Sequence, residues 1–155
     1  MKGHDRLTPE GKKFYAEVKK LAANEVFIGF QAGKKQHEGR DGEKADVAQI
    51  AAFNEFGTST MPARPFLRKS ADENKDVIVK MCTQAAKAIA KGSTEQQELK
   101  KLGVFGASLV QEKIESGSYV PLAPSTIKRK GSSKPLIDTG QMRQSVHYVI
   151  RRKED

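Results

Sequence analysis

Hydrophobic residues recur at helical spacing near the start of the chain, in a stripe formed by Phe14, Val18 and Leu21. Lysines lie between these residues, and Thr8 followed by Pro9 is typical of an N-cap with proline at the first helical position. The pattern predicts an amphipathic helix that ends near Asn24 and turns its apolar stripe inward.

Two segments at opposite ends of the chain have the pattern of β-strands. Residues 25–31 are a short β-prone apolar run. In residues 145–152 the side chains of Val146, Tyr148 and Ile150 occupy alternate positions, as expected of a strand with one buried face. We expect both segments to lie in one small sheet.

The middle of the chain has helical patterns. Val47, Ile50, Ala51 and Asn54 occur at positions i, i+3, i+4 and i+7, which gives a helix one inward face. Gly57 suits the C-terminal stop of this helix. The segment therefore predicts a short helix with a sharp end.

A pair of prolines follows. Pro62 and Pro65 enclose Ala63 and Arg64, and this spacing predicts an extended, stiff connection. After Pro65 the apolar residues keep a helical period until Gly92, so we expect one long helix there.

A second long helix is expected from an N-cap region at residues 93–96 to about Gly117. Gly103 and Gly106 lie inside it, where each costs about 1 kcal/mol relative to alanine, so we expect close packing at these positions. Residues 125–130 have the pattern of a single helical turn.

Residues 33–46 contain Gly, Lys, Glu, His and Asp and almost nothing to bury. This composition predicts an exposed polar loop, and loops of this length are either functional or disordered. Residues 1–6 and 152–155 are expected to be flexible ends.

Together these patterns predict the α+β class and a single domain over residues 1–155. The expected architecture is a small, mainly antiparallel sheet packed against two long helices, with a long polar loop.

Composition narrows the range of functions. Of the 155 residues, 30% are charged and the net charge is +9, which favours contact with nucleic acid or another acidic surface. The alternative is a merely soluble basic protein. No apolar run approaches a membrane span, and no secretory signal is expected. Cys82, the only cysteine, is expected to be a small buried hydrophobe in a protein of the reducing cytoplasm or of a particle assembled there.

Candidate chemistry is sparse. The three histidines lie far apart and lack the spacing of a zinc site. Residues 29–34 resemble a phosphate-binding loop only superficially, because the glycines are too close and Lys35 stands where Ser or Thr is needed. Residues 41–46 lack the spacing of a calcium loop. We therefore predict no catalytic residue, no bound cofactor and no metal.

Three segments occur in an order that resembles a known family: Val47–Thr58 (VAQIAAFNEFGT), Met61–Arg68 (MPARPFLR), and Pro121–Gly131 (PLAPSTIKRKG) continuing through Lys134–Val146 (KPLIDTGQMRQSV). Together they are similar to the neck, tail-completion and head–tail joining proteins of long-tailed bacteriophages, which act in virion morphogenesis. The resemblance covers about residues 44 to 150. The polar loop has no counterpart in it, and Met142 stands where leucine is more usual.

The resemblance implies a structural virion protein, not an enzyme, that forms a ring, commonly a hexamer, at the head–tail junction. Its expected partners are copies of itself, neighbouring neck or connector and tail-tube proteins, and double-stranded DNA passing through the lumen. The expected location is the neck or tail of the virion, and the host cytoplasm during assembly, without a membrane.

The matching segments supply the candidate contacts with other subunits or partners: Asn54, Glu55, Arg64, Arg68, Lys128, Arg129, Lys130, Asp138 and Arg143. The polar loop adds Lys34, Lys35, Arg40 and Asp41. We expect Arg64 to be a rigidly presented cation that pairs with a carboxylate across a subunit boundary or within the fold. Asp138 or Thr139 is the expected N-cap of a short helix that turns Met142 inward. The alternative is that these motifs record backbone geometry and none is a contact surface.

Two rival functions stay open beside the ring-forming adaptor. One is a basic DNA-binding protein that acts through non-specific phosphate contacts, suggested by the net charge. The other is a small enzyme, suggested only by the weak loop motifs.

Overall fold

The computed structural model describes residues 7–33, 36–38 and 44–153. The elements in chain order are α1 (Pro9–Ala23), β1 (Asn24–Gly29), β2 (Gln36–Glu38), β3 (Lys44–Asp46), α2 (Val47–Phe56), α3 (Leu67–Glu73), α4 (Lys75–Ala90), α5 (Glu95–Ser116), α6 (Pro124–Lys130), α7 (Gln141–Gln144) and β4 (His147–Arg152). This mixture of helices with a small antiparallel sheet confirms the α+β class.

The main sheet joins the two ends of the chain, as predicted. β1 and β4 pair antiparallel, with Val26 opposite Ile150 and Ile28 opposite Tyr148. The sheet extends slightly beyond the expected strand, because the Lys153 backbone N–H donates to the Ala23 carbonyl at 2.8 Å. β4 therefore includes Arg152, the first residue of the expected flexible end.

Helix α5 covers one face of this sheet, and its two glycines make the approach possible. A Cβ atom at Gly103 would lie 2.3 Å from the Tyr148 ring, and one at Gly106 would lie 2.0 Å from the Ile28 Cδ1 atom. Both distances are far below van der Waals contact. The prediction that these glycines serve close packing is confirmed.

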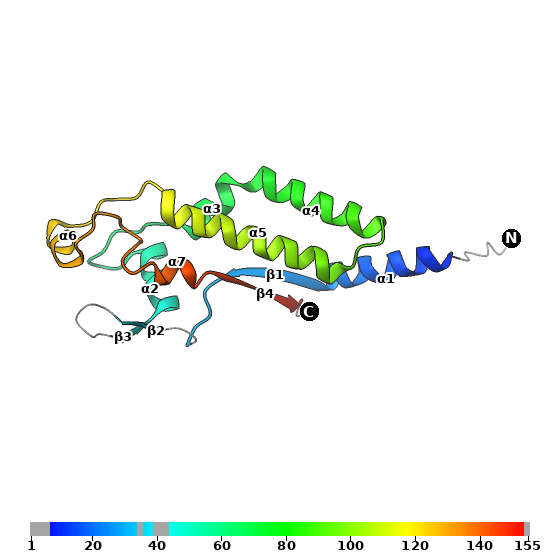
Figure 1. Cartoon of the computed structure of the whole chain (residues 1–155), viewed down its shortest axis with the longest axis horizontal. Coiled ribbons are helices and arrows are strands. Elements are labelled where there is room, and N and C mark those ends of the chain that lie inside the picture. Colours follow the sequence, from blue (N-terminus) through cyan, green and yellow to red (C-terminus); the bar gives the residue numbers. More distant parts are fainter. Residues whose placement is uncertain (1–6, 34–35, 39–43, 154–155) are drawn as a thin grey trace.

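The helix expected between Pro65 and Gly92 is divided. α3 ends at Glu73 and α4 begins at Lys75, because Asn74 leaves helical geometry and its side-chain amide donates to the Ser70 carbonyl at 2.9 Å. α4 packs along α5 on the side away from the sheet (Figure 1). Only one long helix therefore lies directly on the sheet.

Helix α1 begins as predicted, with Thr8 Oγ1 accepting from the Gly11 N–H at 3.1 Å. The orientation expected for its apolar stripe is wrong: Phe14 and Val18 are 43% and 38% exposed. The helix instead docks through buried Glu17, because it projects past the end of the sheet and meets only the ends of its neighbours (Figure 1).

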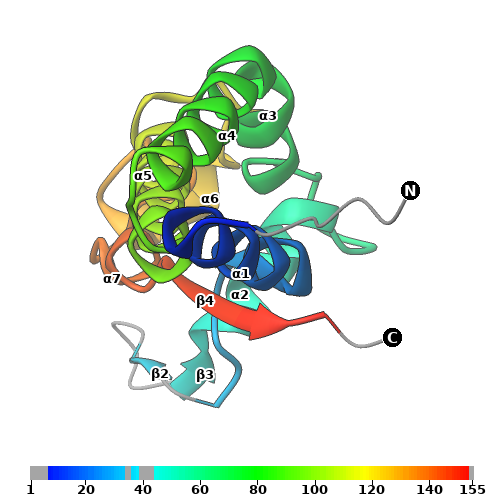
Figure 2. The same cartoon turned by 90° about the vertical axis from the view of Figure 1, so that its right-hand side faces the viewer.

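Glu17 caps the start of α5. Its Oε2 atom accepts from the Glu95 backbone N–H at 2.7 Å, and its Oε1 atom pairs with Lys20 Nζ at 2.8 Å. These two contacts, the lysine first, hold the pKa of the Glu17 carboxyl below its usual value. Figure 2, which looks along the molecule from this end, shows α1 between the α4–α5 pair and β4.

The segment expected as a polar loop contains a hairpin, in which β2 pairs antiparallel with β3. Asp46 closes its base, because Oδ2 accepts from the Gly33 N–H at 2.8 Å and Oδ1 caps α2 through the Ala48 N–H at 3.0 Å. The loop candidates Lys34, Lys35, Arg40 and Asp41 lie outside the described residues, as do the expected flexible end at 1–6 and residues 154–155.

The main core lies where α2, α5 and α7 meet, and its buried hydrophobic residues are Val47, Ala51, Phe66, Ala107, Val110, Ile114, Leu136, Met142 and Val146. Phe66 is completely buried and meets Phe30 edge to face, with ring centroids 6.0 Å apart. Cys82 is exposed, so the expectation that it is buried is wrong. Within the described ranges, no helix is long and apolar enough to cross a membrane.

Candidate partner-binding cleft

The segments that carry the family resemblance gather at one end of the molecule. α2, the stretch 61–68, α6 and the stretch 134–146 lie together at the end opposite α1 (Figure 1). Two charged residues hold them together from the inside. Both were expected on a contact surface.

Glu55 connects α2 to α3. After α2 the chain turns at Gly57, where φ is +76°, and Thr58 and Met61 then close a tight loop through a 2.8 Å backbone hydrogen bond. The loop brings the next segment back against α2. There the Glu55 carboxylate accepts from the backbone N–H groups of residues 66, 67 and 68, at 2.8, 2.8 and 3.1 Å.

Glu55 is only 4% exposed, so no partner protein can reach its carboxylate. The sequence predicted that Glu55 is a subunit contact, and the structure corrects this. Glu55 instead supplies the N-terminal hydrogen bonds of α3, whose own cap position, Phe66, has no polar side chain.

Arg64 connects the 61–68 segment to the chain that follows α5. Its Nε and Nη2 atoms donate to the carbonyl oxygens of Val120 and Pro121, at 2.9 and 3.2 Å, and its backbone N–H donates to the Asn54 carbonyl at 2.6 Å. The residue is 3% exposed, and burial lowers the pKa of its guanidinium. Arg64 is therefore an internal strut, and the prediction that it is a rigidly presented cation is corrected. Its long side chain reaches the backbone carbonyls of the segment that follows α5.

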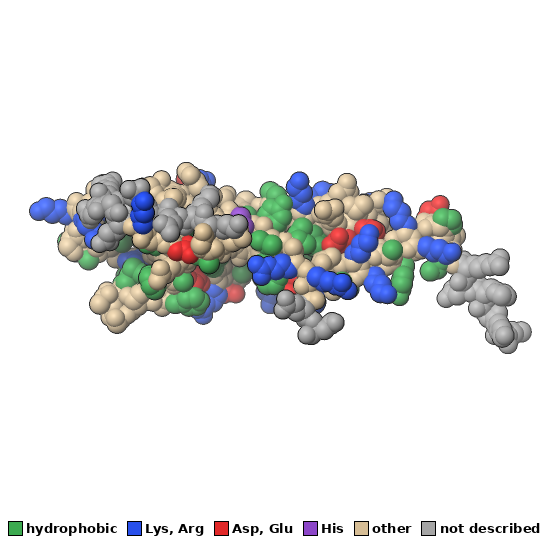
Figure 3. Space-filling model, turned by 90° about the horizontal axis from the view of Figure 1, so that it is seen from below, with side chains coloured by type: hydrophobic (Ala, Val, Ile, Leu, Met, Phe, Trp, Pro, Cys, Tyr) green, Lys and Arg blue, Asp and Glu red, His purple; other side chains and the backbone are tan. Residues whose placement is uncertain are grey.

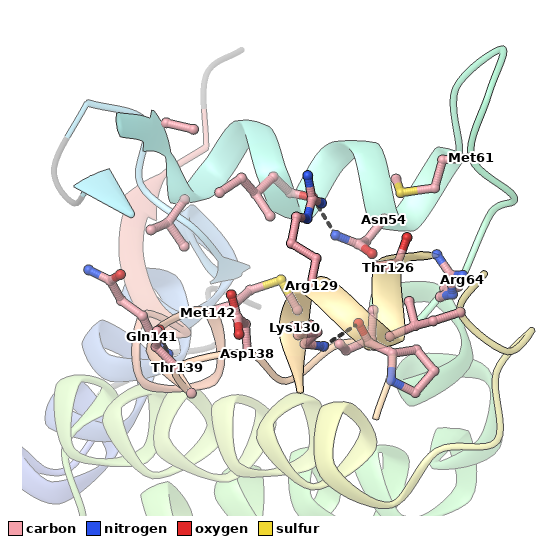
Figure 4. A pocket seen from close by; sticks show the side chains of 17 residues that line it. Asn54, Met61, Arg64, Thr126, Arg129, Lys130, Asp138, Thr139, Gln141 and Met142 are labelled. Carbon is pink, nitrogen blue, oxygen red and sulfur yellow. Dashed lines mark hydrogen bonds between the residues drawn. The ribbon is translucent and has the colours of Figure 1, made fainter. Parts of the chain in front are cut away.

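Between α2 on one side and α6 with residues 135–142 on the other lies a cleft of about 350 Å³ (Figure 4). Its apolar lining is Ala45, Val47, Ile50, Met61, Leu122, Pro135, Leu136 and Met142. Its polar lining is Asn54, Arg64, Thr126, Arg129, Lys130, Asp138, Thr139 and Gln141, with the Gly140 backbone. The cleft therefore brings together five of the nine residues predicted as contacts: Asn54, Arg64, Arg129, Lys130 and Asp138.

Several polar side chains of the cleft are held by hydrogen bonds within the subunit, and one is not. Asn54 Nδ2 donates to the Ile50 carbonyl at 2.9 Å, and Lys130 Nζ donates to the Pro135 carbonyl at 3.3 Å, as the dashed lines in Figure 4 show. Arg129 is exposed and has no hydrogen-bond or ion-pair partner among the described residues. A cation at the rim of an apolar cleft suits an aromatic or acidic group of a partner.

The other predicted contacts lie outside the cleft. Arg68 and Lys128 are exposed, and Arg143 pairs with Glu115 of α5 at 3.1 Å. The expected N-cap of α7 is wrong: Gly140, with φ +78°, takes this position, and Thr139 Oγ1 accepts only a long 3.4 Å bond from Gln141. Met142 is buried as predicted.

The described residues contain no group of three or more His, Cys, Asp or Glu side chains placed to hold a metal ion. No protein-family model matches the chain, and no curated protein and no solved structure is significantly similar to it. What the site can do must therefore be judged from its own chemistry. An apolar floor with Arg129 and Lys130 beside it suits the docking of a side chain or a short segment of another protein.

Sequence reasoning missed two supports of this end of the molecule. Asp46, just before the helix at Val47, has the residue type and position of an N-cap, so the signal was present. The Tyr119 hydroxyl donates to the Lys113 carbonyl at 2.6 Å across Gly117. Burial, with Glu73 and Glu55 nearby, raises the pKa of Tyr119 to about 12. No local pattern predicts this contact.

Proposed function

We propose that this chain is a non-catalytic structural protein of a tailed bacteriophage particle. It forms a ring, commonly a hexamer, at the head–tail junction, completes the tail or joins it to the head, and lets DNA pass through the lumen. Its partners are copies of itself and the neighbouring neck, connector and tail-tube proteins. Its place is the virion, after assembly in the host cytoplasm.

The observation that carries the proposal is the interlock of the three segments that resemble the family. Residues from the first segment bind the second, through Glu55 and the Asn54 carbonyl. Arg64 of the second binds the carbonyls that open the third. A resemblance spread over separate stretches of sequence therefore amounts to a single structural module, and its order along the chain has a physical reason.

The surface of the subunit also supports an assembly role. Large hydrophobic side chains are exposed on several elements: Leu7, Phe14, Tyr15, Val18, Phe27, Phe53, Phe56, Val77, Val79, Val104 and Val120. Single exposed hydrophobics are ordinary, but contiguous ones mark interaction sites. An assembled ring covers the contiguous ones among them, such as Phe53 and Phe56 of α2.

Non-specific DNA binding is the alternative, and the net charge of +9 favours it. Lys and Arg side chains are spread along the length of the face in Figure 3 instead of being gathered in one patch. Diffuse positive charge suits a subunit that lines a passage for DNA as well as one that binds DNA loosely.

The test combines two measurements on the purified full chain. Mass photometry and negative-stain electron microscopy report whether it forms rings, and co-sedimentation reports whether it adds to purified tails. Rings and stoichiometric binding to tails are expected. If the chain stays monomeric, does not bind tails and binds duplex DNA with a steep salt dependence, non-specific DNA binding is favoured instead.

A further inference from the structure

The outward face of α2 is unusual in this molecule. Phe56 is 72% exposed, more than any other large hydrophobic side chain in the described ranges, and Phe53, one turn earlier, is 45% exposed. Gln49, Ala52 and residues 58–60 surround them and are exposed too. We call this surface, made of Gln49, Ala52, Phe53, Phe56 and residues 58–60, the α2 patch.

The α2 patch has no exposed charge. The longest stretch of the chain without lysine or arginine runs from Lys44 to Arg64 and contains the whole patch. Its two carboxylates are both used internally, since Asp46 caps α2 and Glu55 is buried beneath α3. Aromatic residues without neighbouring charges are typical of the centre of a protein–protein interface.

The cleft lies on another side of the same helix. Val47, Ile50 and Asn54 line it. At about 100° per residue around the helix axis, Phe56 lies about 120–180° from these three residues and Phe53 about 60–120° from them. Its floor is apolar, and Arg129 stands at its rim without a partner among the described residues. An aromatic ring suits both, because it fills the apolar floor and offers its negative face to the guanidinium.

Charge decides which surface fits. Lys128 and Arg129 beside the cleft repel a basic surface, and the chain carries 28 Lys and Arg residues. The α2 patch is the aromatic surface of the described chain that brings no cation with it. A second copy of the chain therefore supplies a complementary occupant.

We infer that the α2 patch of one copy docks in the cleft of the next, with Phe53 and Phe56 against the apolar floor and next to Arg129. This inference rests on the proposed function, and it names the contact that builds the ring. Because patch and cleft are different surfaces, the contact is head-to-tail: every subunit gives its patch to one neighbour and its cleft to the other. Such a contact repeats until it closes.

The first test removes the patch. In Phe53→Ser/Phe56→Ser, the concentration at which half of the subunits are assembled should rise at least about tenfold, as for the loss of hot-spot residues. Val79→Ser is the matched control, since Val79 is 56% exposed on α4, and it should assemble like the wild type. Unchanged thermal melts of both variants show that folding is preserved. Wild-type assembly by the patch variant overturns the inference.

The second test uses the head-to-tail geometry. Thr126→Trp fills the cleft, and this variant alone should not assemble. Mixed with the patch variant it should give a heterodimer and nothing larger, because one intact patch and one intact cleft remain. Rings from the mixture, or no complex at all, overturn the inference.

A disulfide test in particles separates this inference from the proposed function. In a Cys82→Ser background, Ser59→Cys and Thr126→Cys together should give a ladder of cross-linked copies, because Ser59 lies in the α2 patch and its change keeps both phenylalanines. Val79→Cys with Thr126→Cys should not. Rings in particles without this ladder would refute the contact and leave the proposed function intact. Absence of the protein from the neck and tail would refute the proposed function itself.

Discussion

Arg64→Ala should destabilise the subunit by about 3–4.5 kcal/mol. The change removes two hydrogen bonds from a charged, buried donor, each of which contributes about 1.5–3 kcal/mol. We expect a loss of stability in the lower half of the summed range. Val120 and Pro121 are exposed, so water can bind their carbonyls once the arginine is gone. Because the free energy of unfolding of a small domain is about 5–15 kcal/mol, this loss is a large fraction of it.

The assay is urea unfolding followed by circular dichroism, with the unfolding free energy taken from the midpoint and the slope. Arg64→Lys should lose roughly half as much, because an ammonium group can reach one carbonyl but not both in a fixed fork. Arg68→Ala is the matched control: its side chain is exposed on the same segment, so the change should stay within about 0.5 kcal/mol.

The opposite pattern would refute the reasoning. If Arg64→Ala unfolds like the wild type while the yield of complete particles per folded subunit falls, Arg64 is the partner contact that the sequence suggested. A stability loss with normal yield per folded subunit supports the internal strut.

Four further predictions follow from single contacts. Glu55→Gln should lower the unfolding free energy by about 1–3 kcal/mol in urea titrations, because an amide keeps one acceptor for three backbone donors. Gly103→Ala should destabilise more than Gly106→Ala in the same assay, because a rigid tyrosine ring opposes the first methyl group and the movable tip of an isoleucine the second. A phenolate absorbance titration should show a step near pH 12 that Tyr119→Phe removes, and the stability tied to the raised pKa of Tyr119 should be complete below pH 10 and lost towards about 12. Truncation after Ser145 should abolish the cooperative melt, since it removes the only partner of β1 within the described sheet.

Alternation and capping patterns predicted much of the fold. The C-terminal strand was identified from alternating apolar residues with one face to bury, and the strand near residue 25 from a short β-prone apolar run; both were expected in one sheet. The N-cap at Thr8 and the glycines of α5 were also predicted correctly, because each depends on backbone geometry that a few neighbouring residues determine.

Buried charges could not be predicted in the same way. Sequence reasoning places Glu and Arg at the surface, which is right for most of them. Glu17, Glu55 and Arg64 are exceptions, because each binds backbone groups of a distant segment, and those groups become neighbours only after folding. The prediction for the apolar stripe of α1 was wrong for the converse reason. The stripe is present, but α1 projects past the sheet, so the domain offers no apolar surface for it to pack against.

The residues of the cleft could be predicted from the sequence only in part. Five of its polar residues were identified through the family resemblance, whereas its apolar floor comes from four separate stretches whose proximity no local pattern records.

The buried charges also bear on how the proposed contact forms. Glu55 and the Asn54 carbonyl fix the far end of α2 to the segment that follows it, and Asp46 fixes its start. The helix that carries Phe53 and Phe56 is therefore held at both ends before any partner arrives. Binding by a rigid helix loses little conformational entropy, so most of the apolar contact energy remains available for association. Hydrogen bonds inside the subunit thus determine how tightly the exposed phenylalanines can bind a neighbour.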